Sequence, residues 1–381
     1  MKIAYLGKTS LSDVDISYLT IAQQKANIDY FLEITPRYLK GAAICIDKIY
    51  PKSGIFKATD IYPQFLRFQN IIDLNHVFIV NTCGKKTWLI KSFVINFLFL
   101  IYLIRNKYTV IHITWPLNIY ELCLYALRKK MVLTVHDPTP HSGNNTTLVR
   151  IRRWFAFKFI QKFILLNKTQ RDDFIKRYNL SKKEVINSSL GAYYYLKAIP
   201  QLEIYELPDK YFLFFGQIAP HKGIEYLLEA VLKVHKYIPN HTLIIAGKGN
   251  YYFDISPYNN KSYIKIINRF IPDTELVSLI EKSEFVVCPY TDATQSGVVM
   301  SAFAFNKPVL ATNVGSIPEI VIHNHYGIVV NARDSDALGE GLLLMLEKSQ
   351  YFSDNIRSEY SSGNHSWNNI ADSIIEEYAK I

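Results

Sequence analysis

The chain has 381 residues, of which 49% are hydrophobic, 20% charged and 14% aromatic, which predicts a packed core and excludes a disordered tail or a fibrous repeat. At about 150 residues per domain, this length favours two domains over one. The net charge of +10 is uneven, because residues 1–205 hold 29 Lys and Arg against 13 Asp and Glu, whereas residues 206–381 hold 14 against 20. The basic half predicts a surface that meets an anionic partner, such as membrane phospholipid, nucleic acid or a phosphorylated substrate.

The N-terminal segment MKIAYLGKTS reaches polar residues after six positions, too soon for the apolar region of a secretory signal. The four cysteines form no C-x-x-C pair, which argues against a disulfide framework or a cysteine zinc site: Cys45, Cys83, Cys123 and Cys288. We therefore expect a cytosolic protein in a reducing compartment.

Short runs rich in β-branched and aromatic residues alternate with segments of helical length, a pattern typical of parallel sheets built from βαβ units. Strands are expected at residues 2–6, 76–81, 109–114, 131–136, 162–167, 211–216, 241–247, 263–270, 284–290, 308–312 and 326–330. The series is interrupted at 198–209, AIPQLEIYELPD, where we place the inter-domain hinge. The predicted fold is α/β, with two Rossmann-like doubly wound domains that face a central cleft. These are residues 1–205, which would bind the acceptor, and residues 206–366, which would bind the nucleotide sugar, with a helix at 367–381 that crosses back to the first domain.

Two segments of the basic half are candidates for a membrane surface. Residues 92–104, SFVINFLFLIYLI, are apolar but only thirteen residues long, whereas about twenty are needed to cross a bilayer. A buried core helix and a helix lying at an interface both remain open.

The second segment, a predicted helix at 150–162, interleaves cations with aromatic rings; the expected membrane contacts are Arg150, Arg152, Arg153, Trp154 and Lys158. Cations attract an anionic leaflet while rings enter the headgroup region, but a solvated helix with its aromatic side facing the core explains the pattern equally. Nucleic acid is not an expected partner, because no helix-turn-helix, zinc finger or RNA-binding strand motif accompanies the charge.

The sharpest local signal is FLFFGQIAPHKGIEYLLEAV at 212–231, an apolar strand, a turn and an apolar-periodic helix. The turn contains Gly216 and ends with Lys222 and Gly223. A glycine turn at a helix start presents free N–H groups and the positive end of the helix dipole to an anion. The spacing matches neither a Walker P-loop nor G-x-G-x-x-G, so a phosphate-binding Lys222 and a solvated lysine both remain open.

A second segment, residues 288–321, is predicted to run from a strand through a polar loop into an apolar helix, followed by another strand and loop. Thr294, Gln295, Ser296 and Gly297 lie where that helix begins. Their hydroxyls and backbone amides are suited to cap the helix or to hold a diphosphate, and the two roles are compatible.

The G-x(5)-K-G turn, the strand IIAGKG at 244–249 and the run AFNKPVLATNVGSIPE at 304–319 together resemble the nucleotide-sugar-binding domain of family 4 glycosyltransferases. The resemblance covers about 150 residues in order, and the first half matches only in outline apart from LTVHDPTPH at 133–141. It implies the GT-B fold and transfer of a sugar from a nucleotide sugar with retention of anomeric configuration. It also implies that Lys222 and the backbone at Gly297 and Val298 contact the donor diphosphate. Together with the turn and helix-start residues, we expect a donor site formed by Gly216, Gln217, Lys222, Gly223, Thr294, Gln295, Ser296, Gly297, Val298 and Glu319.

The sequence departs from the family pattern at three positions. Gln217 stands where the family usually has an Arg, and Ala293 and Ser301 stand where it usually has two glutamates. Those carboxylates are associated with the transferred sugar and the ribose hydroxyls. Asp292, Thr294 or Gln295 are candidates to replace the first, and Glu319 is a candidate to approach in place of the second.

His136 ends a predicted parallel strand, so it is expected at the carboxyl edge of the sheet, where ligands bind. The resemblance implies that it contacts the donor sugar or its phosphate, and a buried structural histidine is the alternative. Asp137 is expected to orient the ring or act on the acceptor, and His141 is a weaker candidate. We assign catalytic roles to His136, Asp137 and Lys222, with Lys222 and helix amides neutralising the departing nucleoside diphosphate.

No cofactor is expected. No metal is expected either, because Asp13 and Asp15, which have the spacing of a metal-binding D-x-D pair, are better explained as a solvated helix start. The favoured function is a hexosyltransferase-type glycosyltransferase that uses a UDP- or GDP-sugar and a saccharide or lipid-linked acceptor in surface polysaccharide or glycan synthesis. It would act in the cytoplasm, as a peripheral protein on the inner face of an anionic membrane. The alternatives are a nucleotide-sugar epimerase of the same fold and a noncatalytic sugar-nucleotide-binding partner of another transferase.

Overall fold

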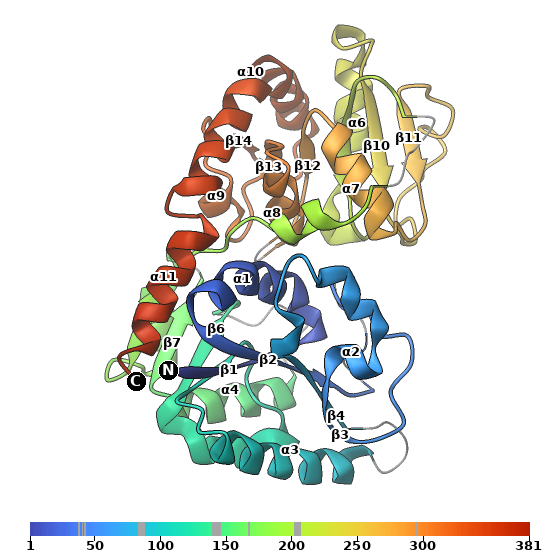
Figure 1. Ribbon diagram of the computed structural model, residues 1–381. Coiled ribbons are helices and arrows are strands. Elements are labelled where there is room, and N and C mark those ends of the chain that lie inside the picture. Colours follow the sequence, from blue (N-terminus) through green and yellow to red (C-terminus); the bar gives the residue numbers. More distant parts are fainter. Residues whose placement is uncertain are drawn as a thin grey trace. The chain divides into compact units, whose positions relative to one another are not determined.

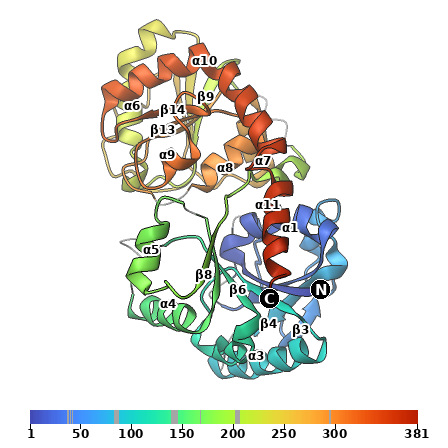
Figure 2. The same cartoon turned by 90° about the vertical axis from the view of Figure 1, so that its left-hand side faces the viewer.

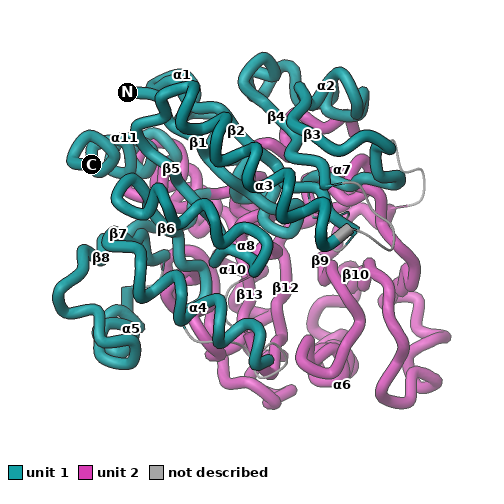
Figure 3. The backbone as a smooth tube through the Cα atoms, turned by 90° about the horizontal axis from the view of Figure 1, so that it is seen from below, with its two compact units in different colours: residues 1–191, 367–381 teal, residues 192–366 magenta. Residues whose placement is uncertain are grey.

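A computed structural model describes residues 1–36, 39, 41, 43–82, 88–138, 146–166, 168–201, 207–293 and 296–381, with only the backbone of Trp88. The chain divides into two compact units (Figure 3). Unit 1 comprises Met1–Gly191 and Trp367–Ile381, and unit 2 comprises Ala192–Ser366. The boundary therefore lies before the predicted hinge at 198–209, and the C-terminal residues are part of unit 1.

Unit 1 is built on an eight-stranded sheet of order β3-β4-β2-β1-β5-β6-β7-β8. Neighbouring strands are parallel except β3, which runs antiparallel to β4. The strands are β1 Lys2–Lys8, β2 Asn27–Ile34, β3 Gly54–Lys57, β4 Val77–Asn81, β5 Val110–Ile113, β6 Met131–Val135, β7 Lys162–Leu165 and β8 Glu184–Asn187.

Unit 2 contains a six-stranded parallel sheet of order β11-β10-β9-β12-β13-β14. Counted within the unit, this is the 3-2-1-4-5-6 order of dinucleotide-binding domains, in which the topology reverses between β9 and β12. The strands are β9 Tyr211–Phe215, β10 Thr242–Ala246, β11 Ile264–Ile267, β12 Val286–Cys288, β13 Val309–Thr312 and β14 Gly327–Val330. Each of the eleven runs predicted as strands contains one, and β2, β3 and β8 are additional.

Helices connect the strands in both units (Figures 1 and 2). Those of unit 1 are α1 Ser12–Lys25, α2 Ala58–Ile61, α3 Trp88–Arg105, α4 Thr147–Phe159, α5 Arg171–Tyr178 and α11 Trp367–Tyr378. Those of unit 2 are α6 Ile224–Val234, α7 Asp273–Lys282, α8 Gly297–Ala304, α9 Ile317–Ile320 and α10 Ser335–Ser362. The 3-10 segments are η1 Thr9–Leu11, η2 Pro63–Phe68, η3 Leu74–His76, η4 Ile119–Lys130, η5 Tyr194–Ala198, η6 Pro220–Lys222 and η7 His235–Tyr237.

In unit 1, α3, η4 and α4 cover one face of the sheet, while α1 and α11 lie side by side (Figures 1 and 2). Phe99 of α3, Leu124 of η4 and Phe157 of α4 join one buried cluster with strand residues such as Phe163. Burying each such side chain contributes about 1.5–3 kcal/mol, so this cluster is the main source of cohesion for the face.

Helix α11 is tied to unit 1 by polar contacts. Tyr378 places its hydroxyl 3.2 Å from that of Tyr18 and also contacts Nδ1 of buried His112. Lys162 of β7 lies 3.3 Å from Glu377, and an exposed ion pair joins α1 to α11. These contacts fasten the last helix of the chain to the domain in which the chain begins.

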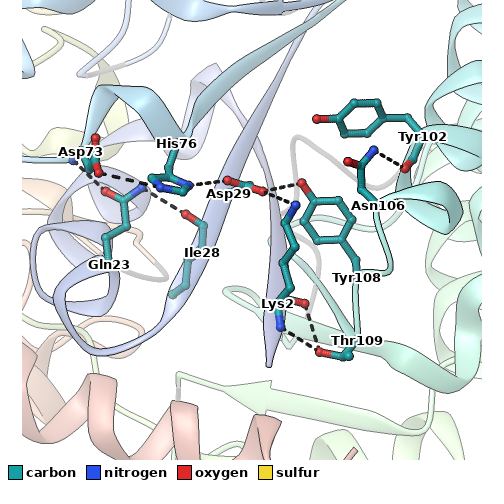
Figure 4. Close-up of polar contacts among 10 residues, drawn as sticks. All are labelled: Lys2, Gln23, Ile28, Asp29, Asp73, His76, Tyr102, Asn106, Tyr108 and Thr109. Atoms are coloured by element: carbon teal, nitrogen blue, oxygen red, sulfur yellow. Dashed lines mark hydrogen bonds and ion pairs between the residues drawn. The ribbon is translucent and has the colours of Figure 1, made fainter.

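The amino ends of β1, β2 and β5 are joined by a buried carboxylate (Figure 4). Asp29 accepts a hydrogen bond from Tyr108, lies 2.6 Å from Nδ1 of His76 and 3.4 Å from Nζ of Lys2. A buried carboxylate is tolerated only with such partners. This cluster stands at the edge opposite the carboxyl ends of the strands, so it organises the sheet and leaves the other edge for ligands.

Candidate functional site

The turn between β9 and α6 in unit 2 has a backbone that only glycine accommodates easily. Gly223 has φ +61°, and a Cβ there would lie 2.1 Å from the carbonyl oxygen of Pro289. Thr291 N donates to His221 O at 3.0 Å, so the turn is docked on the segment that follows β12. The turn therefore lies at the carboxyl ends of β9 and β12, the switch point where parallel sheets of this order bind ligands.

Lys222 lies in this turn with its Nζ 3.7 Å from the centre of the Tyr290 ring. Burial lowers the pKa of its ammonium group, and no ion pair to a carboxylate is found for it within the described residues. A partly desolvated cation that rests on an aromatic face, without a carboxylate, is well placed to attract an anion. Tyr290 was not predicted from the sequence, although its place directly after a strand was a signal.

The N-terminus of α8 lies beside the same turn. A Cβ built at Gly216 would approach Val298 at 3.9 Å, and the buried Ser296 places its hydroxyl 3.4 Å from that of Tyr290. The first N–H groups of a helix have no partner within it and attract anions. The structure thus brings Gly216, Lys222, Gly223, Ser296 and Val298 together, along with exposed Gln217 and Gly297.

The positions of the two missing glutamates carry no carboxylate. Ser301 donates to Gly297 O at 2.8 Å within α8, and Ala293 is half-buried. Thr294 and Gln295 lie outside the described residues. Glu319 is half-buried in α9, after the neighbouring strand β13.

Unit 1 contains a cavity of about 220 Å³ at the carboxyl ends of β1, β5 and β6, closed on one side by α4. Its lining includes Lys8, Thr114, His136, Asp137, Arg152 and Arg153. The predicted residues His136 and Asp137 thus meet at a real cavity, whereas His141 lies outside the described residues.

His136 is buried, and its Nε2 has no hydrogen-bond partner in the described part of the chain. Burial lowers the pKa of its imidazole to about 4, with Asp137 opposing the shift. The ring is therefore neutral at pH 7 and offers one N–H and one lone pair. An unpartnered buried nitrogen at a cavity marks a place for a ligand atom.

Three further groups next to this cavity were not predicted. Lys8 is buried between Glu33 and Glu121, with 2.7 Å separating Lys8 Nζ from Glu121 Oε1. Burial and the neighbouring Glu121 raise the pKa of Glu33 to about 7. These partners are 25 and 113 residues from Lys8 in sequence, so no local pattern could reveal them.

A buried network also borders His136. His112 Nε2 lies 2.7 Å from the hydroxyl of Thr134, and its Nδ1 contacts Tyr378 of α11. Burial lowers the pKa of His112 to about 3, so this ring is neutral too. The network links the C-terminal helix to β6, the strand that directly precedes His136.

The five predicted membrane contacts on α4 point in two directions. Arg150, Trp154 and Lys158 are exposed, and Lys158 Nζ lies 4.4 Å from the Trp154 ring centre. Arg152 and Arg153 line the cavity instead. Arg153 donates to Asp137 O at 2.9 Å, whereas the buried Nε of Arg152 has no described partner.

Asp13 and Asp15, the acidic pair predicted to be a solvated helix start, lie in the first turn of α1. Asp15 is buried and accepts hydrogen bonds from Tyr5 at 3.2 Å and Tyr30 at 3.0 Å. Asp15 is therefore a structural carboxylate, and the prediction of a solvated helix start is wrong for this residue. Within the described ranges no three His, Cys, Asp or Glu side chains gather as a metal site would require.

Residues 209–348 match the family described as "Glycosyl transferases group 1". An uncharacterised glycosyltransferase of Methanocaldococcus jannaschii is 26% identical over 244 residues, 60% of this chain and 63% of that protein. Phosphatidyl-myo-inositol mannosyltransferase of Mycobacterium leprae is 23% identical over 297 residues, 74% of this chain and 75% of that protein. Among solved structures, HepE of Anabaena in complex with UDP matches 100% of both chains, with a TM-score of 0.70 and 15% identity.

The family model and the curated relatives confirm the predicted resemblance, and the solved structure of HepE confirms the predicted fold of two Rossmann-like domains. The matched part of the chain spans less than two thirds of the length of the first three curated relatives, 63%, 45% and 64%. Helices long and apolar enough to cross a membrane are absent from the described residues.

Proposed function

We propose that the chain is a retaining, family 4-like glycosyltransferase with the GT-B fold, which transfers a sugar from a nucleoside-diphosphate donor. The donor is a UDP- or GDP-sugar, and the acceptor is a saccharide or lipid-linked saccharide in surface polysaccharide or glycan synthesis. The single observation that carries this proposal is Lys222 held over Tyr290 beside the N-terminus of α8.

Departure of the nucleoside diphosphate places growing negative charge on its phosphates. Lys222 and the N–H groups of Gly297 and Val298, the first two residues of α8, are oriented before the reaction, so they stabilise that charge without reorganising. Ser296 adds a hydroxyl at the same place. These groups act as the electrostatic part of the mechanism, and no cofactor or metal is included in it.

In unit 1, we assign the sugar and acceptor chemistry to the cavity that contains His136. Neutral His136 has a ring nitrogen available for a sugar hydroxyl or phosphate oxygen. Asp137 is held at its backbone by Arg153, which fixes the loop that follows β6. Arg152 supplies a cation for a phosphate or carboxylate on the acceptor, a role that differs from the membrane contact predicted for it.

Two relatives support parts of this proposal. HepE was solved with UDP, and the mycobacterial relative is named for a mannosyl transfer to phosphatidyl-myo-inositol, a lipid. A lipid-linked acceptor agrees with the exposed Arg150, Trp154 and Lys158 on α4, which we assign to contact with the inner, anionic face of the cell membrane.

A thermal-shift panel of UDP-, GDP-, ADP- and TDP-sugars tests the donor, because a ligand that binds only the native state raises the melting temperature. The proposal requires a shift with a UDP- or GDP-sugar that the Lys222→Met variant loses. No shift with any member would overturn it. Release of a free epimerised sugar without an acceptor would instead identify an epimerase.

A further inference from the structure

Helix α3 is apolar on both sides. Its buried side combines Ile95, Phe99, Leu100 and Leu103 with Ser92 and Asn96, which are 0% and 1% exposed. Its outer side carries Leu89, Ile90, Phe93, Val94, Phe97, Leu98 and Ile104. Ile90 is 69% exposed and Phe97 is 55% exposed. A helix on a water-soluble domain normally places its apolar stripe against the core and its polar side in water.

The seven exposed apolar residues on the outer side of α3, here called the outer stripe, lie at the surface of the folded domain. Asn96 donates to Ser92 O at 2.9 Å, which satisfies its amide inside the domain. Phe99 and Leu103 pack into the core cluster, and Phe99 lies 4.9 Å from Phe31 of β2, ring centre to ring centre. Because buried residues recur along the whole helix, α3 lies flat on the sheet and cannot turn its outer side inward.

The stripe is also the main exposed apolar surface that the structure describes. Seven of the nineteen large hydrophobic residues that are exposed in the described chain lie on this one helix of eighteen residues. Contiguous exposed apolar surface of this kind marks a place where a protein or a membrane docks.

The charged residues around the outer stripe are mostly cations, which favours an anionic partner. Between Asp73 and Asp172 the sequence has only two carboxylates, Glu121, which is buried and paired with Lys8, and Asp137 at the cavity. Exposed cations flank the stripe and the neighbouring η4 and α4: Lys91, Arg105, Lys107, Arg128, Lys129, Lys130, Arg150 and Lys158. Figure 1 shows α3 and α4 on the same face of the unit 1 sheet.

We propose that the outer face of α3 inserts into the headgroup region of an anionic bilayer, with the surrounding lysines and arginines bound to lipid phosphates. This deepens the membrane contact assigned above to α4 and makes α3 the inserted element. A flat amphipathic helix ringed by cations is the arrangement by which monotopic proteins bind membranes. A second copy of the chain fits this face poorly, because two such rims would bring like charges together.

The test uses the full chain and sedimentation with two kinds of vesicle, pure phosphatidylcholine and phosphatidylcholine with one third phosphatidylglycerol. The double variant Ile90→Gln/Phe97→Gln removes insertion, and Phe270→Gln is the matched control, since Phe270 is 73% exposed in unit 2. We expect binding to the anionic vesicles that falls roughly tenfold or more in the double variant and is unchanged in the control. The melting temperature of the double variant should not fall, because both side chains already face water.

Three results would overturn the inference. Equal vesicle binding by the wild type and the double variant would exclude insertion of α3. Loss of binding only with Arg150→Glu/Lys158→Glu would leave a purely electrostatic contact through α4. A wild-type dimer that the double variant converts to a monomer, without vesicle binding, would show that a second copy covers the face. Titration with UDP and GDP in the same variants separates these outcomes from failure of the transferase proposal, since donor binding in unit 2 should be unaffected.

Discussion

Replacing Lys222 with Met tests the proposed donor site, because it removes the charge and keeps most of the length of the side chain. In the structure this ammonium group rests 3.7 Å from the Tyr290 ring centre and has no ion pair with a described carboxylate. A charge-assisted hydrogen bond to a phosphate contributes about 1.5–3 kcal/mol. We therefore expect the Kd for UDP or GDP, whichever the wild type binds, to rise roughly 10- to 100-fold.

The same change should leave the unliganded protein about as stable. Losing the contact with Tyr290 costs about 0.5–2 kcal/mol, while relieving the desolvation of the lysine offsets that loss. We expect the free energy of unfolding to change by less than about 1 kcal/mol. A large loss of donor affinity with little change in the free energy of unfolding would indicate that Lys222 serves ligand binding and not folding.

Isothermal titration calorimetry measures the affinities, and urea denaturation measures the stability. Lys236→Met is the matched control, because Lys236 Nζ lies 4.7 Å from the Tyr237 ring centre on the exposed surface of the same unit. An unchanged Kd in Lys222→Met refutes the proposed role of the turn. An equal loss in the control would reduce the effect to general electrostatic attraction.

Two further predictions concern one residue in each unit. Because the pKa of His136 is lowered to about 4, the unfolded chain binds more protons between pH 6.5 and 4, so the native state loses up to ~3 kcal/mol as the pH falls through this range. Denaturation at pH 7 and pH 4 should show that His136→Gln loses less stability than the wild type, and parallel losses would contradict the burial argument. Gly223→Ala should lower the free energy of unfolding by about 2 kcal/mol or more and weaken donor binding, because its φ is +61° and the new Cβ would meet Pro289 O at 2.1 Å. Unfolding curves that coincide with those of the wild type would show that the turn adapts.

The local sequence pattern predicted most of the strands. The elements that it missed depend on contacts between residues that are distant in sequence. Strand β2 was not predicted because its sequence, NIDYFLEI, places two acidic residues among apolar ones. Both are buried, since Asp29 meets Tyr108, 79 residues away, and Glu33 meets Lys8, 25 residues away. A strand whose charges are neutralised by distant partners cannot be recognised from its own residues.

The boundary between the two units also depends on contacts between residues that are distant in sequence. Prolines and acidic residues placed the hinge at 198–209, but Tyr193 donates to Met300 O at 3.1 Å and η5 packs beside α8. These contacts assign residues 192–199 to unit 2. Composition marks an irregular segment, whereas tertiary contacts decide to which domain it belongs.

The proposed donor turn could be singled out from the sequence because its residues are neighbours in the chain. Gly216, Lys222 and Gly223 shape one turn, so their spacing is visible in the sequence. The unit 1 cavity gathers residues from β1, β5, β6 and α4, and only His136 and Asp137 were predicted at it. Arg152 and Arg153 follow each other in a helix whose basic and aromatic pattern gave no sign that these two side chains turn toward a cavity.

The three departures from the family pattern offset one another electrostatically. Gln217 in place of an arginine removes one positive charge, while Ala293 and Ser301 in place of glutamates remove two negative charges, so the proposed donor site has one more net positive charge than the family pattern. Attraction to the proposed diphosphate would thereby be kept, while the two glutamates that the resemblance associates with the sugar and the ribose are absent. We therefore expect the nucleoside to add little to binding, so that inorganic pyrophosphate and the nucleoside diphosphate have similar Kd values in calorimetry. Ser301→Glu should favour the nucleoside diphosphate over pyrophosphate, because it places a carboxylate where the family has one. In the wild type the Ser301 hydroxyl donates to Gly297 O instead. An unchanged ratio of the two Kd values would show that this position does not face the ribose.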